Sequence, residues 1–359
     1  MLPKSSLKFL EKLLRTCSPS GFENEAAAEF RSYLGSFCHK VSTDVLGNVI
    51  GVLNPDAPFK VMLAGHYDEI GFQIVHISDD GLLNFRANGG IDRTTLPGTE
   101  VLILAEGGKV PGIIGRKPIH LTKEEERNKV GEIKDMWIDI GAEDKKAAEL
   151  LVAVGDPAAV APNFKLLGKD KVKVMSKGLD DKIGAFVAAE TIRELSARKL
   201  DIGVYCVGTV QEELGLRGAH TSAFGVSPDV GFAIDVGFAT DLPDIGNKEL
   251  GVLKLGLGPA VCRSADNNQV LVRRMIDIAK RHKLPYQVKA GFRATGGTDT
   301  AVIQMTGAGV ATALVSVPNR YMHTPVELCD LRDAEGAVKL LVETIAALKP
   351  TDTFIPGID

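Results

Sequence analysis

Cysteine is scarce in this 359-residue chain, and its arrangement argues against a disulfide framework and against a cysteine-based zinc knuckle. There are five cysteines, an odd number, and no two of them form a CxxC pair. Scattered cysteines of this kind are typical of proteins in a reducing compartment, where buried thiols act as small apolar side chains. We therefore expect a cytoplasmic protein whose thiols are structural.

Long apolar runs and an excess of basic charge are also missing. The apolar run at residues 202–210 is far shorter than the ~20 residues that a membrane helix needs. The charged, amphipathic N-terminal stretch lacks the apolar core and cleavage site of a signal peptide. The net charge is −4, so the composition offers no basic surface for nucleic acid. We expect a globular protein that binds neither membranes nor nucleic acid.

The pattern of the sequence indicates two domains, one inserted into the other. A single hydrophobic core rarely extends beyond roughly 250–300 residues, and this chain has 359 residues. Between about residues 71 and 163, short alternating segments are separated by glycine-rich turns, without a helix–strand rhythm. We predict an α/β catalytic domain from residues 1–70 and 164–359, with a small β-barrel or sandwich at residues 71–163.

Hydrophobic periodicity predicts most of the elements of the α/β domain. Ser5 or Ser6 is a plausible N-cap for the first helix, and the charged stretch at 117–129 is expected to be an exposed loop. Helices are expected at residues 5–17, 23–34, 183–195, 219–224, 268–283, 299–305 and 330–348. Strands are expected at residues 59–64, 202–210, 230–235 and 310–317, and a strand pair at 40–53.

Two adjacent carboxylates, Glu212 and Glu213, follow the buried strand predicted at residues 202–210. In an open α/β sheet, ligands bind beyond the carboxyl ends of the strands; the alternative is a polar strand end that faces water. Neighbouring residues of an extended chain point to different sides, so the two glutamates should not share one role. One could bind a metal ion while the other moves a proton.

His66 and Asp68 stand at the end of another buried strand, at residues 59–64. The aspartate can hold the imidazole ring while the other ring nitrogen binds a metal ion. A structural histidine is the alternative. The position of this HxD pair, at a strand end like that of the glutamate pair, favours a shared site.

Asp180 and Asp181 directly precede the helix predicted at residues 183–195. Simple capping is one explanation, because negative charge in the first turn is favoured by the helix dipole. A doubled aspartate could instead leave one carboxylate free to bridge two cations.

Asp235 ends the strand predicted at residues 230–235, and His323 follows the strand predicted at 310–317. Five side chains are therefore expected to converge on one edge of the sheet: His66, Asp180, Glu213, Asp235 and His323. Two imidazoles and three carboxylates suit divalent ions such as Zn²⁺, Co²⁺ or Mn²⁺. A site that holds two such ions ~3.5–4 Å apart would polarise a carbonyl and lower the pKa of a bridging water. The glycine-rich segment 291–299 lacks the lysine of a nucleotide-binding Walker motif, so we do not expect a nucleotide.

The segments GHYDEIGF, GLDDKIGAF, VQEELGLRGA, AIDVG and RYMHTPVE resemble the motifs of the tetrahedral (TET) dinuclear metallo-aminopeptidases. That family includes glutamyl, leucyl and lysyl aminopeptidases and proteins once labelled endoglucanase M. The resemblance covers essentially the whole chain. It implies a mixed-sheet α/β/α zinc-peptidase domain with an inserted small β-barrel for subunit contacts. It further implies a hollow homododecamer, built from dimers, with the active sites inside.

The resemblance also implies a set of ligands for two divalent ions per subunit, Zn²⁺ or Co²⁺ with Mn²⁺ as a further candidate. Asp180 would bridge the ions. His66 and Asp235 would complete the shell of one ion, and Glu213 and His323 that of the other.

Two further residues would carry the chemistry if the resemblance holds. Glu212 would be the general base on the bridging water, and Asp68 would orient His66. Tyr67 and the run 293–295 depart from the family pattern, which leaves the substrate preference open. Arg293 or Arg217 could favour an acidic substrate residue, or each could be a structural ion-pair partner.

The predicted reaction is hydrolysis of the N-terminal residue of short peptides. A related metallo-carboxypeptidase or deacylase with the same five ligands is the alternative. A glycosidase, suggested by the old label, needs two carboxyls roughly 5–10 Å apart that flank the bond, which adjacent residues are poorly placed to supply. A non-catalytic scaffold is disfavoured by the intact Glu212 and ligand set.

Overall fold

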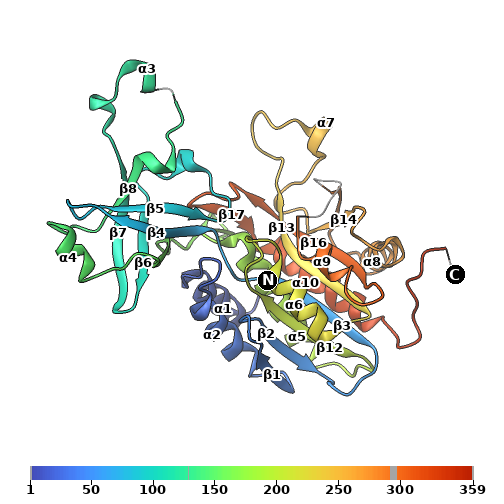
Figure 1. Cartoon of the computed structure of the whole chain (residues 1–359). Coiled ribbons are helices and arrows are strands. Elements are labelled where there is room, and N and C mark those ends of the chain that lie inside the picture. Colours follow the sequence, from blue (N-terminus) through green and yellow to red (C-terminus); the bar gives the residue numbers. More distant parts are fainter. Residues whose placement is uncertain (1, 128, 292–296, 358–359) are drawn as a thin grey trace.

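The computed structural model describes residues 2–127, 129–291 and 297–357 of the chain. A large α/β domain carries a smaller β-barrel that extends from one side of it (Figure 1). Each part has a hydrophobic core of its own. The predicted fold class, a mixed-sheet α/β domain with an inserted β-barrel, is confirmed.

The sheet of the α/β domain is mixed, and eleven strands form it within the described residues. Its centre is the parallel set β12, β3, β13 and β16. Antiparallel strands lie on both sides, with β2 beside β12 and β17 and β14 beside β16. The strands are, in sheet order, β1 (Lys40–Thr43), β2 (Val49–Leu53), β12 (Gly203–Thr209), β3 (Lys60–His66), β13 (Val230–Phe238), β16 (Ala311–Arg320), β17 (Glu327–Asp330), β11 (Lys173–Ser176) and β10 (Lys165–Leu167). Beside this series, β14 (Ala260–Arg263) pairs with β16, and β15 (Gln287–Ala290) pairs with β14.

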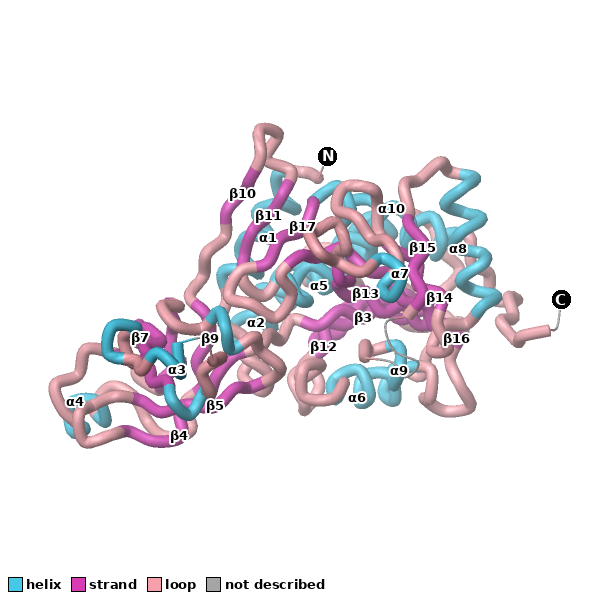
Figure 2. The backbone as a smooth tube through the Cα atoms, turned by 90° about the horizontal axis from the view of Figure 1, so that it is seen from above, coloured by secondary structure: helices cyan, strands magenta, loops and turns pink. Residues whose placement is uncertain are grey.

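Helices cover both faces of this sheet, which gives three layers (Figure 2). The thicker layer has its apolar side chains in the main core and contains α1 (Lys4–Arg15), α2 (Asn24–Leu34), α5 (Leu179–Leu195), α8 (Gln269–Arg281) and α10 (Leu331–Ala346). The opposite layer packs on a smaller core and contains α6 (Arg217–Val226) and α9 (Thr300–Ile303). The short α7 (Asn247–Leu250) lies in a loop after β13.

The barrel is closed, with the strands in the order β4, β5, β8, β7, β6 and β9. They span β4 (Gly71–Ile77), β5 (Leu83–Asn88), β6 (Glu100–Ala105), β7 (Gly108–Arg116), β8 (Met136–Asp139) and β9 (Pro157–Val160). The first and last strands pair directly, Phe72 with Ala158, so the chain leaves and re-enters the α/β domain at neighbouring points. Two short helices accompany the barrel, α3 (Glu124–Arg127) and α4 (Lys145–Glu149).

Two local predictions were wrong. The first helix has Pro3 at its N-cap and no side-chain cap; Ser6 is buried instead and donates a hydrogen bond to Glu190 Oε2 at 2.7 Å. The charged stretch at 117–129 is exposed as expected, yet it is not a plain loop, because a 3₁₀ turn and α3 form within it. The first error arises because the hydroxyl of Ser6 has a buried partner, Glu190, that is 184 residues away in the chain.

Helix α5 packs closely against β3 near the carboxyl end of that strand. Gly65 makes this approach possible, because a Cβ atom there would lie 2.5 Å from the backbone nitrogen of Ala185. In the next strand, Thr209 is in register with His66, so β12 and β3 end side by side.

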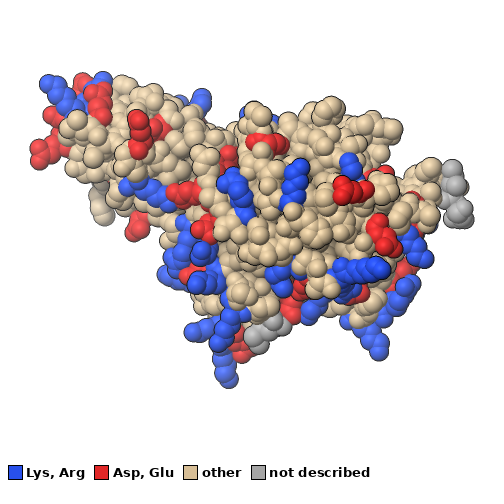
Figure 3. All heavy atoms as spheres, turned by 90° about the horizontal axis from the view of Figure 1, so that it is seen from below, with Lys and Arg blue, Asp and Glu red and all other residues tan. Residues whose placement is uncertain are grey.

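The surface of the molecule carries charges of both signs. On the face shown in Figure 3, lysine and arginine side chains are interspersed with aspartate and glutamate. Among the described residues, no helix combines the length and the apolar character needed to span a bilayer.

Candidate metal centre and active site

The five predicted ligands and the predicted base Glu212 meet at the carboxyl edge of the parallel strands. They form two groups, and in each group one ligand atom per residue lies within 4.8 Å of the others. The first group contains His66, Glu212 and Asp235, and the second contains Asp180, Glu213 and His323. The two adjacent glutamates thus belong to different groups, as expected for neighbouring residues that point to different sides.

Asp180 lies between the two histidines. Its Oδ1 atom is 3.2 Å from Nε2 of His66, and its Oδ2 atom is 3.2 Å from Nε2 of His323. Each oxygen therefore faces the imidazole of a different group, which is the arrangement that a carboxylate bridging two cations requires.

The glutamates differ in how closely they approach the histidines. Glu213 Oε1 lies 3.3 Å from Nε2 of His323, whereas Glu212 Oε2 lies 3.8 Å from Nε2 of His66. Glu213 and Asp180 thus lie at similar distances from Nε2 of His323, whereas Glu212 lies further from Nε2 of His66.

The two adjacent aspartates make different contacts. Asp180 and Asp181 come before the regular part of α5, and neither has helical backbone angles. Asp181 accepts hydrogen bonds from the backbone N–H groups of Gly184 at 3.1 Å and His66 at 3.3 Å. Asp181 therefore caps the helix and joins it to β3, which leaves Asp180 to face the histidines.

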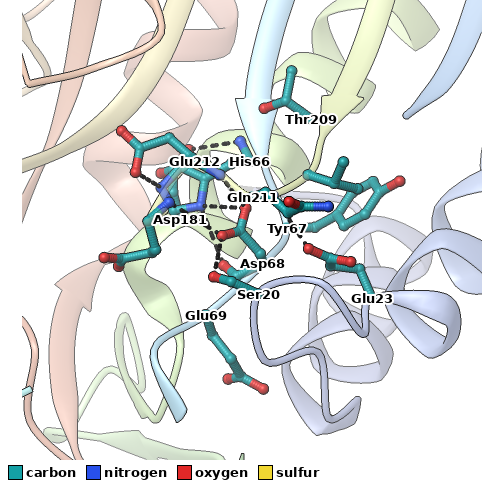
Figure 4. A network of polar contacts seen from close by, with 12 residues as sticks. Ser20, Glu23, His66, Tyr67, Asp68, Glu69, Asp181, Thr209, Gln211 and Glu212 are labelled. Carbon is teal, nitrogen blue, oxygen red and sulfur yellow. Dashed lines mark hydrogen bonds and ion pairs between the residues drawn. The ribbon is translucent and has the colours of Figure 1, made fainter. Parts of the chain in front are cut away.

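Asp68 connects the HxD segment to the glutamate pair (Figure 4). Its Oδ1 atom accepts a hydrogen bond from the backbone N–H of Glu212 at 3.0 Å and lies 3.4 Å from Nδ1 of His66. Its Oδ2 atom accepts from the backbone N–H of Glu213 at 3.2 Å and from the hydroxyl of Ser20 at 2.6 Å. Asp68 is fully buried, so this one carboxylate fixes the backbone of both glutamates besides facing the imidazole.

Glu327 is a site residue that the sequence analysis missed. Its Oε2 atom accepts a hydrogen bond from the backbone N–H of Asp180 at 2.8 Å, and its Oε1 atom accepts from the backbone N–H of His323 at 3.1 Å. Two residues of the second group are therefore held together by a buried side chain at the start of β17. The only signal in the sequence is a glutamate four residues after His323.

Asp299 is a second missed residue near this edge. Its Oδ2 atom accepts a hydrogen bond from the hydroxyl of Thr209 at 2.8 Å, while Oδ1 has no partner among the described residues. Burial raises the pKa of Asp299 to about 6. It adds a further carboxyl group to an edge already crowded with carboxylates.

The electrostatics of this edge favour a bound cation. Burial and the neighbouring carboxylates raise the pKa values of Glu212 and Asp235 well above their usual range, and burial raises that of Glu213. Burial alone would lower the pKa of His323, but Asp180 and Glu213 raise it to about 11. These shifts have one cause, which is buried negative charge without enough positive charge to balance it. The negative charge of these side chains therefore suits divalent cations, and imidazole and carboxylate groups are usual ligands of such ions.

Both groups open into one cavity of ≈ 530 Å³. This volume lies within the range usual for small-molecule sites. Besides the six side chains of the two groups, the cavity is lined by residues of β13, β14, β15 and β16.

Two of the residues singled out for substrate preference, Tyr67 and Arg217, do not line this cavity. Tyr67 is fully buried, packs against Phe30 and donates a hydrogen bond to the carbonyl of Gly47 at 2.8 Å. Figure 4 shows Tyr67 pointing away from His66. Arg217 donates to Gln211 Oε1 at 3.0 Å on the surface, and Arg293 lies outside the described residues.

Comparisons with known proteins extend over nearly the whole chain. The family described as M42 glutamyl aminopeptidase matches residues 47–340. The lysyl aminopeptidase of Pyrococcus furiosus is 36% identical over 353 residues, which cover 97% of this chain and 99% of that protein.

Solved structures show the same relationship. The TET aminopeptidase of the marine sediment archaeon Thaumarchaeota archaeon SCGC AB-539-E09 superposes with a TM-score of 0.92 at 36% identity, covering 96% of this chain and 97% of that one. The TET1 peptidase of Pyrococcus horikoshii, described as able to assemble into a tetrahedron or a large octahedral shell, gives 0.85 at 33%, covering 96% and 100%. Since the matches run through both the barrel and the α/β domain, they confirm the resemblance to TET aminopeptidases, and the chain belongs to the M42 glutamyl aminopeptidase family.

Proposed function

We propose that this protein is a metal-dependent aminopeptidase that removes N-terminal residues from short peptides and holds two divalent ions per subunit. The observation that carries the proposal is the position of Asp180, whose two oxygens face His66 and His323 at equal distances of 3.2 Å. The ions would be Zn²⁺ or Co²⁺, with Mn²⁺ as a further candidate. His66 and Asp235 would hold one ion and Glu213 and His323 the other, with Asp180 shared between them.

The ions, when bound, would supply Lewis-acid chemistry for the peptide carbonyl and make water more acidic. Glu212 is the proposed general base, which accepts a proton from the attacking water and returns it to the leaving amine. Its greater distance from His66, 3.8 Å against 3.2 Å for Asp180, supports a base rather than a ligand. Burial raises the pKa of Glu212, and nearby cations would favour its ionised, proton-accepting form.

Asp68 is the proposed positioning residue for this chemistry. It would orient His66 through the contact with Nδ1, and its bonds to the backbone of Glu212 and Glu213 would keep base and ligand in separate places. The role of Asp68 is thus wider than the sequence analysis expected.

Two glutamine variants separate the base from the ligand. Glu213→Gln should lose bound metal, because a neutral amide is a poor substitute for a carboxylate. Glu212→Gln should retain both ions and a normal fold, yet lose ~10²–10⁴-fold in turnover, the usual contribution of a positioned base. Metal content by mass spectrometry and turnover of aminoacyl anilides test both. Loss of metal from Glu212→Gln, or near-normal turnover in it, would contradict this division.

Chelation tests the metal requirement itself. Prolonged dialysis against a chelator should abolish peptide hydrolysis, and Zn²⁺, Co²⁺ or Mn²⁺ should restore it. Full activity in exhaustively stripped protein would refute the proposal. Peptides with free and blocked N-termini distinguish an aminopeptidase from a carboxypeptidase or deacylase with the same ligands, since only an aminopeptidase needs the free amine.

We also propose assembly into a homododecamer built from dimers, with the segment at residues 71–163 as the dimerisation domain, and a cytoplasmic location. The support for assembly is the TET1 relative, described as forming a tetrahedron or an octahedral shell. Sedimentation of the metal-loaded protein should show a large particle, and a monomer at micromolar concentration would contradict this proposal.

A further inference from the structure

The loop that carries the adjacent glutamates is held by two buried carboxylates, not by Asp68 alone. Three consecutive backbone N–H groups, those of Gln211, Glu212 and Glu213, donate hydrogen bonds to carboxylate oxygens. Asp68 accepts the last two bonds, and Oε1 of Glu23 accepts the first at 3.1 Å (Figure 4). Glu23 therefore contacts the residue directly before the proposed general base.

The side chain of Glu23 is directed toward this loop and not toward its own helix. Glu23 is the N-cap residue of α2, yet its side chain makes no capping hydrogen bond. Only 6% of its surface is exposed. Besides the bond from Gln211, its Oε1 atom accepts one from the backbone N–H of Gly21 at 2.6 Å. A glutamate that served only its helix would accept from the free N–H groups of the first turn, so the contacts of Glu23 indicate a role outside α2.

Gln211 has a backbone conformation that needs support. Its φ angle is +53°, in the left-handed region that is unfavourable for residues other than glycine. The chain turns here, between the end of β12 and Glu212, so the backbone angles of Gln211 help to decide where the base points. Without Glu23, the N–H group of Gln211 would lose its only hydrogen-bond acceptor among the described residues.

The strength of this contact depends on the charge of Glu23. Burial raises the pKa of Glu23 to about 7, and the nearby carboxylate of Asp68 acts in the same direction. Tyr67 and Asp68, which follow β3, are the titratable groups that face it. Within the described parts of the chain, Glu23 forms no ion pair with a lysine, arginine or histidine. An ionised acceptor makes a stronger hydrogen bond than a neutral one, so Glu23 holds Gln211 most firmly when it is deprotonated.

We propose that Glu23 is a positioning residue for Glu212, whose ionised carboxylate fixes the turn at Gln211 and thereby the direction of the base. This inference rests on the proposed aminopeptidase function. Glu23 belongs to neither group of candidate ligands and does not line the cavity. Its loss should therefore reduce kcat and leave metal content and KM unchanged.

The test compares two variants of Glu23 as metal-loaded proteins, with leucyl, lysyl and glutamyl anilides as substrates. In Glu23→Ala, which removes the acceptor, kcat should fall roughly 10- to 100-fold, as for other residues that support a metal site. In Glu23→Gln, which keeps an oxygen acceptor without its charge, kcat should fall roughly 5- to 10-fold. Glu190→Gln is the matched control. Glu190 is also fully buried, and it accepts hydrogen bonds from Ser6 and Arg193 away from the cavity, so this variant should lose stability without losing kcat.

The pH dependence gives a readout that a purely structural role would not change. Below its pKa, Glu23 is protonated, and its carbonyl oxygen is then a neutral acceptor like the amide oxygen of glutamine. The ratio of wild-type to Glu23→Gln kcat should therefore be close to 1 at about pH 5.5 and rise to roughly 5–10 at about pH 8.5. This comparison needs only the glutamine variant, so it stands even if Glu23→Ala does not fold.

Three results would overturn the inference and leave the aminopeptidase proposal standing. They are a kcat ratio near 1 at every pH, a loss of turnover that follows a loss of bound metal, and an equal loss of kcat in Glu190→Gln. A metal-loaded wild type that cleaves none of the three anilides would refute both proposals.

Discussion

Replacing Asp68 by asparagine should disturb the candidate site more than its single changed atom suggests. Both oxygens of the carboxylate accept a backbone hydrogen bond, Oδ1 from Glu212 and Oδ2 from Glu213. An amide has only one oxygen. Whichever way the asparagine is turned, its NH₂ group must face the N–H group of one of the two glutamates, and that N–H loses its acceptor.

The size of the effect follows from that lost bond. A hydrogen bond to a charged group contributes about 1.5–3 kcal/mol, and a buried donor without a partner costs about 1–3 kcal/mol. Because both figures describe the same lost bond, the penalty of Asp68→Asn should be about 1.5–3 kcal/mol, divided between the stability of the fold and the order of the site. Changes to residues that support metal ligands typically reduce metal affinity or activity by roughly 10- to 100-fold, and we expect that range.

The assay measures metal content, anilide turnover and chemical denaturation on the same variant. Asp333→Asn is the matched control, because Asp333 is also fully buried and accepts two backbone hydrogen bonds, from Gly256 and Gly258, both at 2.7 Å. Asp333 does not line the described cavity, so its variant should change stability alone. If Asp68→Asn keeps its metal and full turnover, or behaves like Asp333→Asn, the assigned positioning role is wrong.

Two further predictions concern Glu327 and Asp333. Glu327→Ala removes the acceptor shared by the backbones of Asp180 and His323, so metal affinity in a chelator competition should fall roughly 10- to 100-fold; unchanged affinity would show that these two residues are held in place without Glu327. Burial raises the pKa of Asp333 from 3.8 to about 6, so the folded protein binds this proton more tightly than the unfolded chain does. Its contribution to stability is present below about pH 4 and is lost as the pH rises through 6. The unfolding free energy of the wild type, relative to Asp333→Asn, should thus decrease by about 3 kcal/mol across that interval in denaturant titrations, and a flat difference would contradict the assigned pKa.

The sequence predicted those parts of the site that follow buried strands. The runs before His66, Glu212 and Asp235 are apolar enough to be recognised as central strands, and parallel strands end at one edge. His323 was harder to place, because it comes three residues beyond Arg320, the last residue of β16. Its position in the site is fixed by Glu327, whose buried carboxylate has no periodic signal in the sequence.

Asp299 and Lys289, a residue of β15 that lines the cavity, show why the rest could not be predicted. The four-residue β15 is too short to give a clear alternation, and only its pairing with β14 shows which face of the sheet Lys289 occupies. Asp299 reaches the site through a hydrogen bond to Thr209, 90 residues earlier in the chain. Contacts at such separations depend on how the whole sheet assembles, and local pattern does not encode them.

The residues at the sheet edge come from widely separated parts of the chain, beginning with His66 and reaching completion only at His323. During synthesis, a ribosome-bound chain therefore carries His66, Glu212 and Asp235 well before the second group can close. A nascent or truncated chain that stops short of His323 lacks one imidazole of the pair that faces Asp180. If the site hydrolyses peptides as proposed, the order of its residues delays that activity until the strands that carry it have all been synthesised.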